Sequence, residues 1–195
     1  MSATENIVEQ TQYLTFHLAG EVYAVGILQA KEIIEYGTLT KVPQTPPSIR
    51  GVINLRGSVV SVVDLAVKFG LPPSPVTERT CIVIVEVNLE GERTVMGIIA
   101  DAVSKVIHLL PRDIEPPPAF GTRVRVDFLR GMGKAAEKKF VLLLDIDKVL
   151  SSEDLQASAA LQATPGDPQP VKEIPDSGAS GVPVGGEPTG PSVTT

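Results

Sequence analysis

Hydrophobic and polar positions alternate in short runs along the first 150 residues of the chain, and Val, Ile and Leu dominate these runs. Short β-branched runs bounded by Gly, Pro, Asn or Asp are typical of β-strands. The pattern predicts strands at 13–18, 22–27, 52–55, 59–63, 80–87, 94–99, 124–129 and 140–146. A helical turn leading into a further strand is expected at both 28–34 and 101–110, and short helices at 65–71 and 145–153.

The segment 42–65 has the clearest local pattern. Two aliphatic runs flank Arg56 and Gly57, and Gly57 supplies the positive φ that a tight turn requires. The segment therefore predicts a β-hairpin with Arg56 at or near its tip. Asp64 follows the second strand and precedes a predicted helix, so its carboxylate is expected to cap that helix, and Asp145 has the same setting.

A weak internal repeat relates residues 25–65 to residues 96–146. Each copy begins with a Gly-Ile pair, continues through a proline-rich loop, contains Leu-Arg-Gly (55–57 and 129–131), and ends in an aliphatic run followed by Asp. The second copy carries an insertion at 132–139. The preserved order of these features indicates a duplication. It predicts an all-β fold of two related units, each of about five short strands closed to hide their edges.

Composition limits the possible function. The chain has no Trp and 4% aromatic residues, which argues against a site that reads sugars or single-stranded nucleic acid by stacking. The net charge of −6 lies mostly at the two ends, so the central part is nearly neutral and steering toward nucleic acid is not indicated. No apolar run is long enough for a membrane span or resembles a signal peptide. We therefore expect a cytoplasmic protein.

No group of residues has the spacing of a catalytic or metal site. His17 and His108 lie on separate predicted strands without a neighbouring cluster of metal ligands, and Cys81 lies in an aliphatic run that is expected to raise its thiol pKa. The glycines occupy turn positions rather than a phosphate-binding pattern. We expect no enzyme, no cofactor and no metal, and we expect a binding module in which an arginine such as Arg56 is an anchor.

Residues 49–65 read I-R-G-V-I-N-L-R-G-S-V-V-S-V-V-D-L and closely resemble the core signature of the CheW family of chemotaxis coupling proteins. The resemblance extends over the whole predicted folded part. It implies two packed five-stranded SH3-like β-barrels joined by short helices, with a groove between them. The expected organisation is a flexible N-terminus (1–10), a CheW-like domain (11–155) with barrels at roughly 20–80 and 11–19 plus 81–150, and a disordered tail rich in Pro, Gly, Ser and Thr (156–195).

The resemblance also implies a function and partners. CheW proteins are non-catalytic adaptors that couple the cytoplasmic tips of methyl-accepting chemoreceptors to the regulatory domain of the histidine kinase CheA, in clusters at the membrane. Carried over by motif, the expected receptor-binding residues are Glu32, Ile33, Gly51, Arg56, Gly57 and Val85. The expected kinase-binding residues are Pro116 and Phe120.

Simpler interpretations exist for several of these residues. Ile33 and Val85 fit plain core positions, and Glu32 and Arg56 fit solvated charges. Two other functions also remain open. One is a CheW-like scaffold of a non-flagellar pathway, such as surface motility or development. The other is a small-ligand-binding or enzymatic β-barrel, which requires a pocket with converging polar groups that the sequence does not predict.

Overall fold

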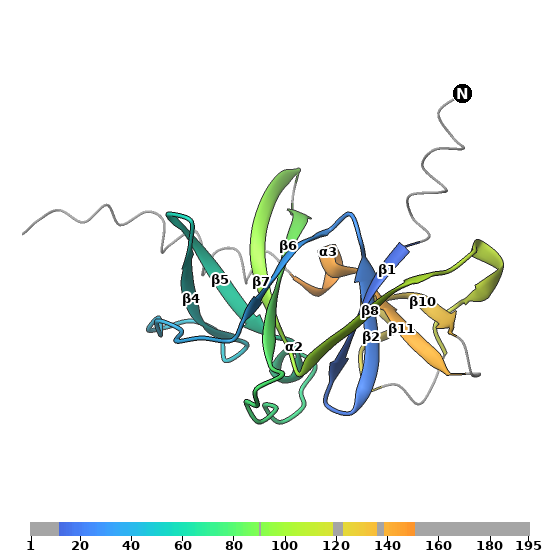
Figure 1. Cartoon of the computed structure of the whole chain (residues 1–195), viewed down its shortest axis with the longest axis horizontal. Coiled ribbons are helices and arrows are strands. Elements are labelled where there is room, and N and C mark those ends of the chain that lie inside the picture. Colours follow the sequence, from blue (N-terminus) through green and yellow to red (C-terminus); the bar gives the residue numbers. More distant parts are fainter. Residues whose placement is uncertain (1–11, 90, 119–122, 136–138, 151–195) are drawn as a thin grey trace, which may run out of the picture. The chain divides into compact units, whose positions relative to one another are not determined.

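A computed structural model describes residues 12–89, 91–118, 123–135 and 139–150 of the chain. These residues form two β-sheets with a few short helices (Figure 1). The expected flexible N-terminus and the expected disordered tail at 156–195 lie outside the described residues. The all-β fold class predicted from the sequence is confirmed.

The first sheet has six strands in the order β8-β1-β2-β11-β10-β9. These strands are β1 (Gln12–Leu18), β2 (Glu21–Gly26), β8 (Ala102–His108), β9 (Ile114–Glu115), β10 (Leu129–Lys134) and β11 (Phe140–Leu144). The second sheet has five strands in the order β3-β6-β7-β5-β4. These strands are β3 (Ala30–Glu35), β4 (Ile49–Leu55), β5 (Ser58–Asp64), β6 (Cys81–Leu89) and β7 (Glu92–Ala100).

The described helices are short and lie at the ends of strands. Helix α2 (Leu65–Lys68) follows β5, and α3 (Ile146–Val149) follows β11. Two 3-10 turns, η1 (Pro111–Asp113) and η2 (Val126–Phe128), precede β9 and β10.

Each sheet curls around a hydrophobic cluster of its own. In the five-stranded sheet, Ile34 of β3 and Ile53 of β4 come from opposite edges, yet both pack on one cluster: Val60, Val62, Ile82, Ile84 and Ile99. In the six-stranded sheet, Ile107 of β8 and Ile114 of β9 also come from opposite edges and pack on one cluster: Tyr13, Ala24, Leu109, Val141 and Leu143. We therefore call the two sheets the five-stranded barrel and the six-stranded barrel.

A third and larger cluster joins the two barrels. It contains residues of both, including Tyr23 of β2 and Val83 of β6. A chain of rings runs through it, from Phe16 to Tyr23 to Phe69 to Phe128, with centroids 6.1, 5.9 and 6.0 Å apart. Ring pairs at this spacing stabilise a core beyond the area they bury, so these four aromatic residues strengthen the contact between the barrels.

The two barrels repeat one topology. The order β3-β6-β7-β5-β4 corresponds strand by strand to β8-β1-β2-β11-β10. The same pair is parallel in each barrel, β5 with β7 and β11 with β2. The outer hairpins even shift register at the same place, between Ile49 and Gly51 and between Leu129 and Gly131. This correspondence supports the duplication predicted from the sequence.

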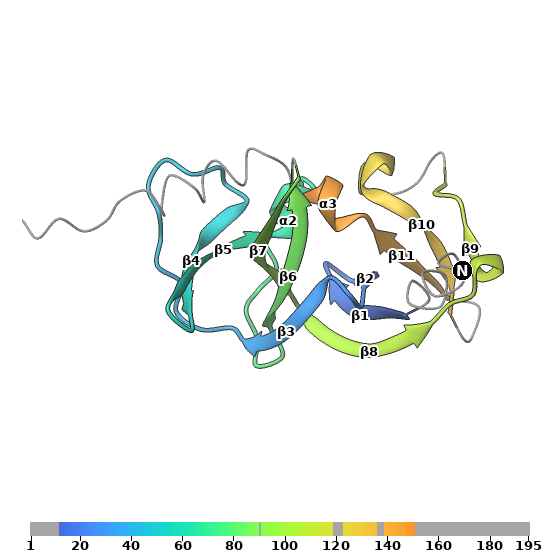
Figure 2. The same ribbon diagram turned by 90° about the horizontal axis from the view of Figure 1, so that it is seen from above.

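The five-stranded barrel is built from one continuous part of the chain, β3 to β7, and the six-stranded barrel is built from the strands before and after it. Strand β3 follows β2 in sequence but pairs with β6, and β8 follows β7 but pairs with β1 (Figure 2). The barrels therefore divide the chain differently from the expected boundaries of 20–80 and 11–19 plus 81–150. Strand β2 belongs to the six-stranded barrel, and β6 and β7 belong to the five-stranded barrel.

Three local expectations were wrong. Residues 102–108 form a strand without the expected helical turn. The strand expected at 124–129 is a 3-10 turn at Val126–Phe128, and the strand begins at Leu129 instead. The alternation of apolar and polar residues in this segment was misleading. Phe128 packs on Phe69 in the shared core, and the guanidinium of Arg125 lies over the Phe128 ring, 5.2 Å from its centroid. The two-residue strand β9 was not expected, so one barrel has six strands rather than five.

Candidate functional site

The hairpin of β4 and β5 has a two-residue turn at Arg56 and Gly57. Both have positive φ, 53° for Arg56 and 90° for Gly57, which is the requirement of a type I′ turn. The side-chain oxygen of Asn54 accepts a hydrogen bond from the Gly57 amide at 2.8 Å. The positive φ of Gly57 was predicted, whereas that of Arg56 was not, because a non-glycine residue seldom adopts it.

Arg56 forms an ion pair with Glu32 of β3, with Nη2 and Oε2 2.8 Å apart. The Arg56 side chain is 80% exposed and that of Glu32 is 27% exposed. The pair joins the tip of the hairpin to the opposite edge strand, so it spans the seam of the five-stranded barrel. Because exposed pairs contribute about 0–1 kcal/mol to stability, the fold does not explain why an arginine stands at this position.

Ile33 faces the opposite side of β3 from Glu32 and is 47% exposed. It lies directly across from Val83 of β6, whose side chain belongs to the core shared by the barrels. Since residues paired across strands share a face, Ile33 sits at the rim of that shared core. The core interpretation of Ile33 is thus incomplete, because nearly half of its surface remains accessible.

Val85 does not reach the surface. It is 0% exposed and packs inside the core that joins the barrels. Its expected role as a receptor contact is therefore corrected to a core position, as expected for an aliphatic residue in a strand covered on both faces.

The two glycines of the expected site have different roles. A Cβ at Gly51 would lie 2.5 Å from the carbonyl oxygen of Thr40, and Gly51 has a φ of 150°. Thr40 also pairs with Val52, so the close backbone approach at Gly51 is made by this chain itself. Gly57 has no atom within 4 Å of an added Cβ, and its requirement is the positive φ of the turn.

The expected kinase-binding residues lie near β9. Pro116 directly follows this strand and is exposed. Phe120 lies outside the described residues. The two groups of expected residues therefore belong to different barrels, with Glu32, Gly51, Arg56 and Gly57 on the five-stranded barrel and Pro116 on the six-stranded barrel.

The internal repeat aligns differently from the sequence prediction. The structure pairs Arg50-Gly51 with Arg130-Gly131, rather than residues 55–57 with 129–131. Arg50 contacts Asp64 at 3.5 Å and Arg130 contacts Asp145 at 3.9 Å, so each arginine meets the aspartate at the end of its own hairpin. A Cβ at Gly131 would lie 2.6 Å from the Glu115 carbonyl oxygen, as at Gly51.

Arg130 therefore corresponds to Arg50, and the repeated Leu-Arg-Gly does not support Arg56 as a functional residue. The sequence contained a signal for the correct alignment. The distance along the chain from Gly51 to Asp64 nearly equals that from Gly131 to Asp145, whereas the Leu-Arg-Gly at 55–57 is much closer to Asp64. What remains in favour of Arg56 is its exposed position at the seam.

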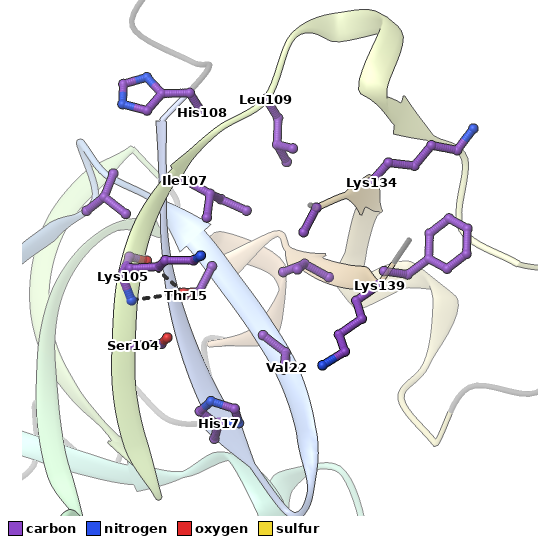
Figure 3. A pocket seen from close by; sticks show the side chains of 14 residues that line it. Thr15, His17, Val22, Ser104, Lys105, Ile107, His108, Leu109, Lys134 and Lys139 are labelled. Carbon is purple, nitrogen blue, oxygen red and sulfur yellow. Dashed lines mark hydrogen bonds between the residues drawn. The ribbon is translucent and has the colours of Figure 1, made fainter. Parts of the chain in front are cut away.

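A cavity of about 480 Å³ opens into the six-stranded barrel (Figure 3). Its lining includes Lys105, Lys134 and Lys139, which the sequence analysis did not single out, together with His17 and His108. The sequence predicted no such pocket, because its lining residues come from strands that are distant in sequence.

The expected direction of the Cys81 pKa is confirmed. Burial raises the pKa of this thiol, and a hydrogen bond with the Val103 backbone lowers it by a smaller amount.

The family model of the CheW-like domain matches residues 12–154 of the chain. The chain belongs to this family. It is 38% identical over 144 residues to the chemotaxis protein CheW of Klebsiella aerogenes, which covers 74% of this chain and 84% of that protein. It is also 30% identical over 128 residues to the protein FrzA of Myxococcus xanthus, which covers 66% of this chain and 78% of FrzA.

A solved CheW structure has the same fold. The scaffolding protein TtCheW from Thermoanaerobacter tengcongensis aligns with a TM-score of 0.64 and 33% identity, over 72% of this CheW-like chain and 88% of that one. Among the described residues no helix is both long and apolar enough to span a membrane. The described part of the chain also contains no group of three His, Cys, Asp or Glu side chains placed to hold a metal ion.

Proposed function

We propose that this CheW-like chain is a non-catalytic adaptor that couples methyl-accepting chemoreceptors to a CheA-type histidine kinase in bacterial chemotaxis. The match of the family model, which includes every described residue, carries this proposal. Relatives named as chemotaxis proteins and a solved structure titled as a scaffolding protein support it. Such an adaptor works in the cytoplasm and joins receptor clusters at the membrane through its partners.

The receptor would bind the five-stranded barrel at the seam formed by Glu32, Arg56 and Gly57, with Ile33 at the neighbouring rim. The Arg56 guanidinium has five N–H donors in a rigid plane. Its bond to Glu32 is donated by the Nη2 nitrogen. The remaining donors can bind a partner while the side-chain stem packs against apolar atoms. Gly51 would support this site indirectly, by allowing the backbone contact with Thr40.

The kinase regulatory domain would bind the six-stranded barrel near Pro116, with Phe120 in the same loop. Because the two barrels share one core, partners on both would be held in a fixed relation by one rigid body. The signalling role then rests on coupled binding free energies rather than on a reaction.

A second candidate function is that of a CheW-like scaffold in a non-flagellar pathway. The match to FrzA, a relative that is not named as a chemotaxis protein, favours it. The two functions share the fold and the mode of action. They differ in the partners, which depend on a few surface residues.

The experiment that tests the proposal is recovery of receptor and kinase together on the immobilised chain. Arg56→Ala is expected to remain folded, because the exposed pair with Glu32 adds little stability. It is expected to reduce recovery of the receptor, and with it of the receptor–kinase assembly, about tenfold or more, as for an arginine hot spot. Arg79→Ala is the matched control, since Arg79 is an exposed arginine in the loop before β6.

Three outcomes of this experiment are distinct. Equal recovery with the two variants would remove Arg56 from the site. Failure of the unaltered chain to retain either partner would overturn the coupling function. Retention of a different receptor–kinase pair, from a pathway that does not control flagella, would establish the second candidate.

A further inference from the structure

One segment of the chain crosses from one edge of the six-stranded barrel to the other. It runs from the end of β8, which is one edge strand, through η1 to β9, which is the other. We call residues 109–115 the strap. Pro116, an expected kinase-binding residue, comes directly after the strap. The position of the strap therefore determines the position of Pro116.

The strap is joined to the sheet over a short distance. In the part of the chain that the structure describes, β9 pairs with β10 alone, with Glu115 opposite Met132 and Ile114 opposite Gly133. On its other side, β10 pairs with β11 at five positions. Glu115 also forms an ion pair with Lys134, but both side chains are partly exposed, so the pair adds little stability. The end of the strap is thus held mainly by a ladder of two residues.

Two glycines of β10 make room for the strap. A Cβ at Gly131 would lie 2.6 Å from the Glu115 carbonyl oxygen and 2.8 Å from Cγ2 of Ile114. A Cβ at Gly133 would collide with Cδ1 of Leu109. In the five-stranded barrel, Ile53 stands at the position that corresponds to Gly133. The room for Leu109 is therefore specific to the six-stranded barrel.

Leu109 holds the start of the strap. Its side chain is buried and belongs to the inner cluster of the six-stranded barrel. Figure 3 shows this side chain pointing into the hollow whose lining it shares. The strap is thus attached at two places, by Leu109 at its start and by β9 at its end.

The turn between these two attachments satisfies its own polar groups. The Asp113 amide donates a hydrogen bond to the Leu110 carbonyl at 2.8 Å, and the Leu110 amide donates one to the Asp113 carboxylate at 3.1 Å. Moving the turn breaks neither bond. Segments with few attachments to the rest of a protein open locally, at a lower free energy than global unfolding. The end of the strap can therefore leave β10 while the barrel stays folded.

We infer that the strap is a detachable segment, and that the kinase regulatory domain binds the six-stranded barrel with the strap docked on Gly131 and Gly133. This inference rests on the proposed coupling function. When β9 leaves β10, Pro116 moves with it and the kinase-binding segment loses its position. The apparent affinity for the kinase then falls with the fraction of molecules in which the strap is docked.

Hydrogen exchange of the full chain tests whether the strap detaches. The β9 amides are expected to exchange at least tenfold faster than those in the middle of β2, in the same barrel. Their exchange is also expected to depend little on low concentrations of denaturant, because local opening exposes little surface. Gly131→Ala is expected to raise the exchange rate of the β9 amides about tenfold further, since its Cβ would press on the Glu115 backbone.

Recovery of each partner separately on the immobilised chain tests the consequence for binding. Gly131→Ala is expected to lower recovery of the kinase regulatory domain about threefold or more. It is expected to leave recovery of the receptor unchanged, because the expected receptor site lies on the other barrel. Gly37→Ala is the matched control, since no atom lies within 4 Å of an added Cβ there, and it is expected to change neither exchange nor recovery.

A cross-link tests the same inference in the opposite direction. Glu115→Cys combined with Met132→Cys places two thiols directly opposite each other on β9 and β10. Paired residues of antiparallel strands are close enough for a disulfide. The oxidised form is expected to exchange its β9 amides at least tenfold more slowly than the reduced form, and to retain at least as much kinase. Because this variant leaves both glycines in place, it decides the question even if Gly131→Ala does not fold.

Each unfavourable result has a separate meaning. Equal exchange of β9 and β2, or no effect of the cross-link on β9, would show that the strap does not detach. Faster β9 exchange in Gly131→Ala with unchanged kinase recovery, or lower recovery in the oxidised form than in the reduced form, would show that the kinase does not require the docked strap. Failure of the unaltered chain to retain the kinase would overturn the coupling function and the role of the strap in it, whereas detachment is decided by exchange alone.

Discussion

The interiors of the two barrels differ although their strands correspond. In the five-stranded barrel, the inward positions hold Ile53, Leu55 and Ile84, which pack on the inner cluster or belong to it. By strand order and register, the corresponding positions in the six-stranded barrel are Gly133, Ala135 and Thr15. Small residues thus replace large ones on one side of the second barrel. At Gly133 the Leu109 side chain occupies the space, whereas Thr15 and Ala135 line the cavity.

The charges around the two barrel openings differ in the same way. In the five-stranded barrel, Glu86 pairs with both Lys31 and Arg93, at 3.2 and 3.6 Å, and Glu32 pairs with Arg56. The counterpart of Glu86 in the six-stranded barrel is His17, which lines the cavity. A duplicated fold can therefore keep its topology while aliphatic side chains fill the interior of one copy and the other copy has an open cavity.

The strongest way to break this comparison is to empty the filled barrel. Ile84→Ala is expected to lower the free energy of unfolding by about 2–5 kcal/mol, because it removes a buried side chain and leaves a cavity. Denaturant unfolding measures the change. Ile84→Val is the graded control and is expected to cost about 0.5–1.5 kcal/mol. If Ile84→Ala cost no more than Ile84→Val, the five-stranded barrel would not be a packed interior.

The second test concerns the glycines that begin the two outer hairpins. Gly51→Ala is expected to cost about 1–3 kcal/mol, since its Cβ would meet the Thr40 carbonyl and its φ is positive. Gly131→Ala is expected to cost less, because its contact is with the two-residue strand β9 and its φ is not in the left-handed region. Unfolding by denaturant compares the two.

Gly37→Ala is the control for this pair, because no atom lies within 4 Å of an added Cβ there. It is expected to leave stability unchanged. Equal costs at Gly37 and Gly51 would show that the shared close approach of the hairpins does not constrain the fold.

The third test removes the Thr15 hydroxyl, which joins β1 to β8 in the six-stranded barrel. Thr15→Val keeps the side-chain shape but leaves the Lys105 amide and carbonyl without their hydroxyl partner. A lost partner costs roughly 1–3 kcal/mol for a buried group, and partial exposure of this site places the expected value near 1 kcal/mol. Hydrogen exchange of the Lys105 amide is the specific readout, and it is expected to become faster. Unchanged exchange would contradict the bond.

The smallest expected difference is between the two aspartates that precede the helices. Asp64 accepts a hydrogen bond from the Val67 amide at 3.2 Å, so Asp64→Ala is expected to cost about 1 kcal/mol as a lost N-cap. Asp145 forms ion pairs but no capping bond with its side chain, so Asp145→Ala is expected to cost about 0.5 kcal/mol. Thermal unfolding compares the two, and Asp64→Asn, which can still cap, is expected to be milder than Asp64→Ala.

Local chemistry explains why parts of the fold were predictable. The hairpin with Arg56 at its tip follows from Gly57 and two aliphatic runs, all close in sequence. The cap at Asp64 also follows from neighbouring residues. The Asp145 cap was predicted by the same reasoning, but its carboxylate pairs with Arg130 and Lys148 instead.

Long-range pairing explains what was missed. The pairing of β3 with β6 and of β8 with β1, and with it the cavity wall at Lys105, depends on which strands become neighbours. Hydrophobic periodicity does not contain that information. Val85 was assigned to a surface for the same reason, because its burial depends on the second barrel lying over β6.

The pairing of β1 and β2 with strands from the end of the domain has a consequence for synthesis on the ribosome. Strand β1 emerges early, yet β8, which covers one of its sides, is made far later. Ala24 of β2 likewise waits for Leu143, close to the end of the described chain. Pairing over such long sequence separations is slow, so the six-stranded barrel cannot finish until β11 has been made, whereas all strands of the five-stranded barrel are present once β7 has been made. Cutting the gene between the two copies would leave two fragments with bare strand edges, and the fragments would need each other to become soluble.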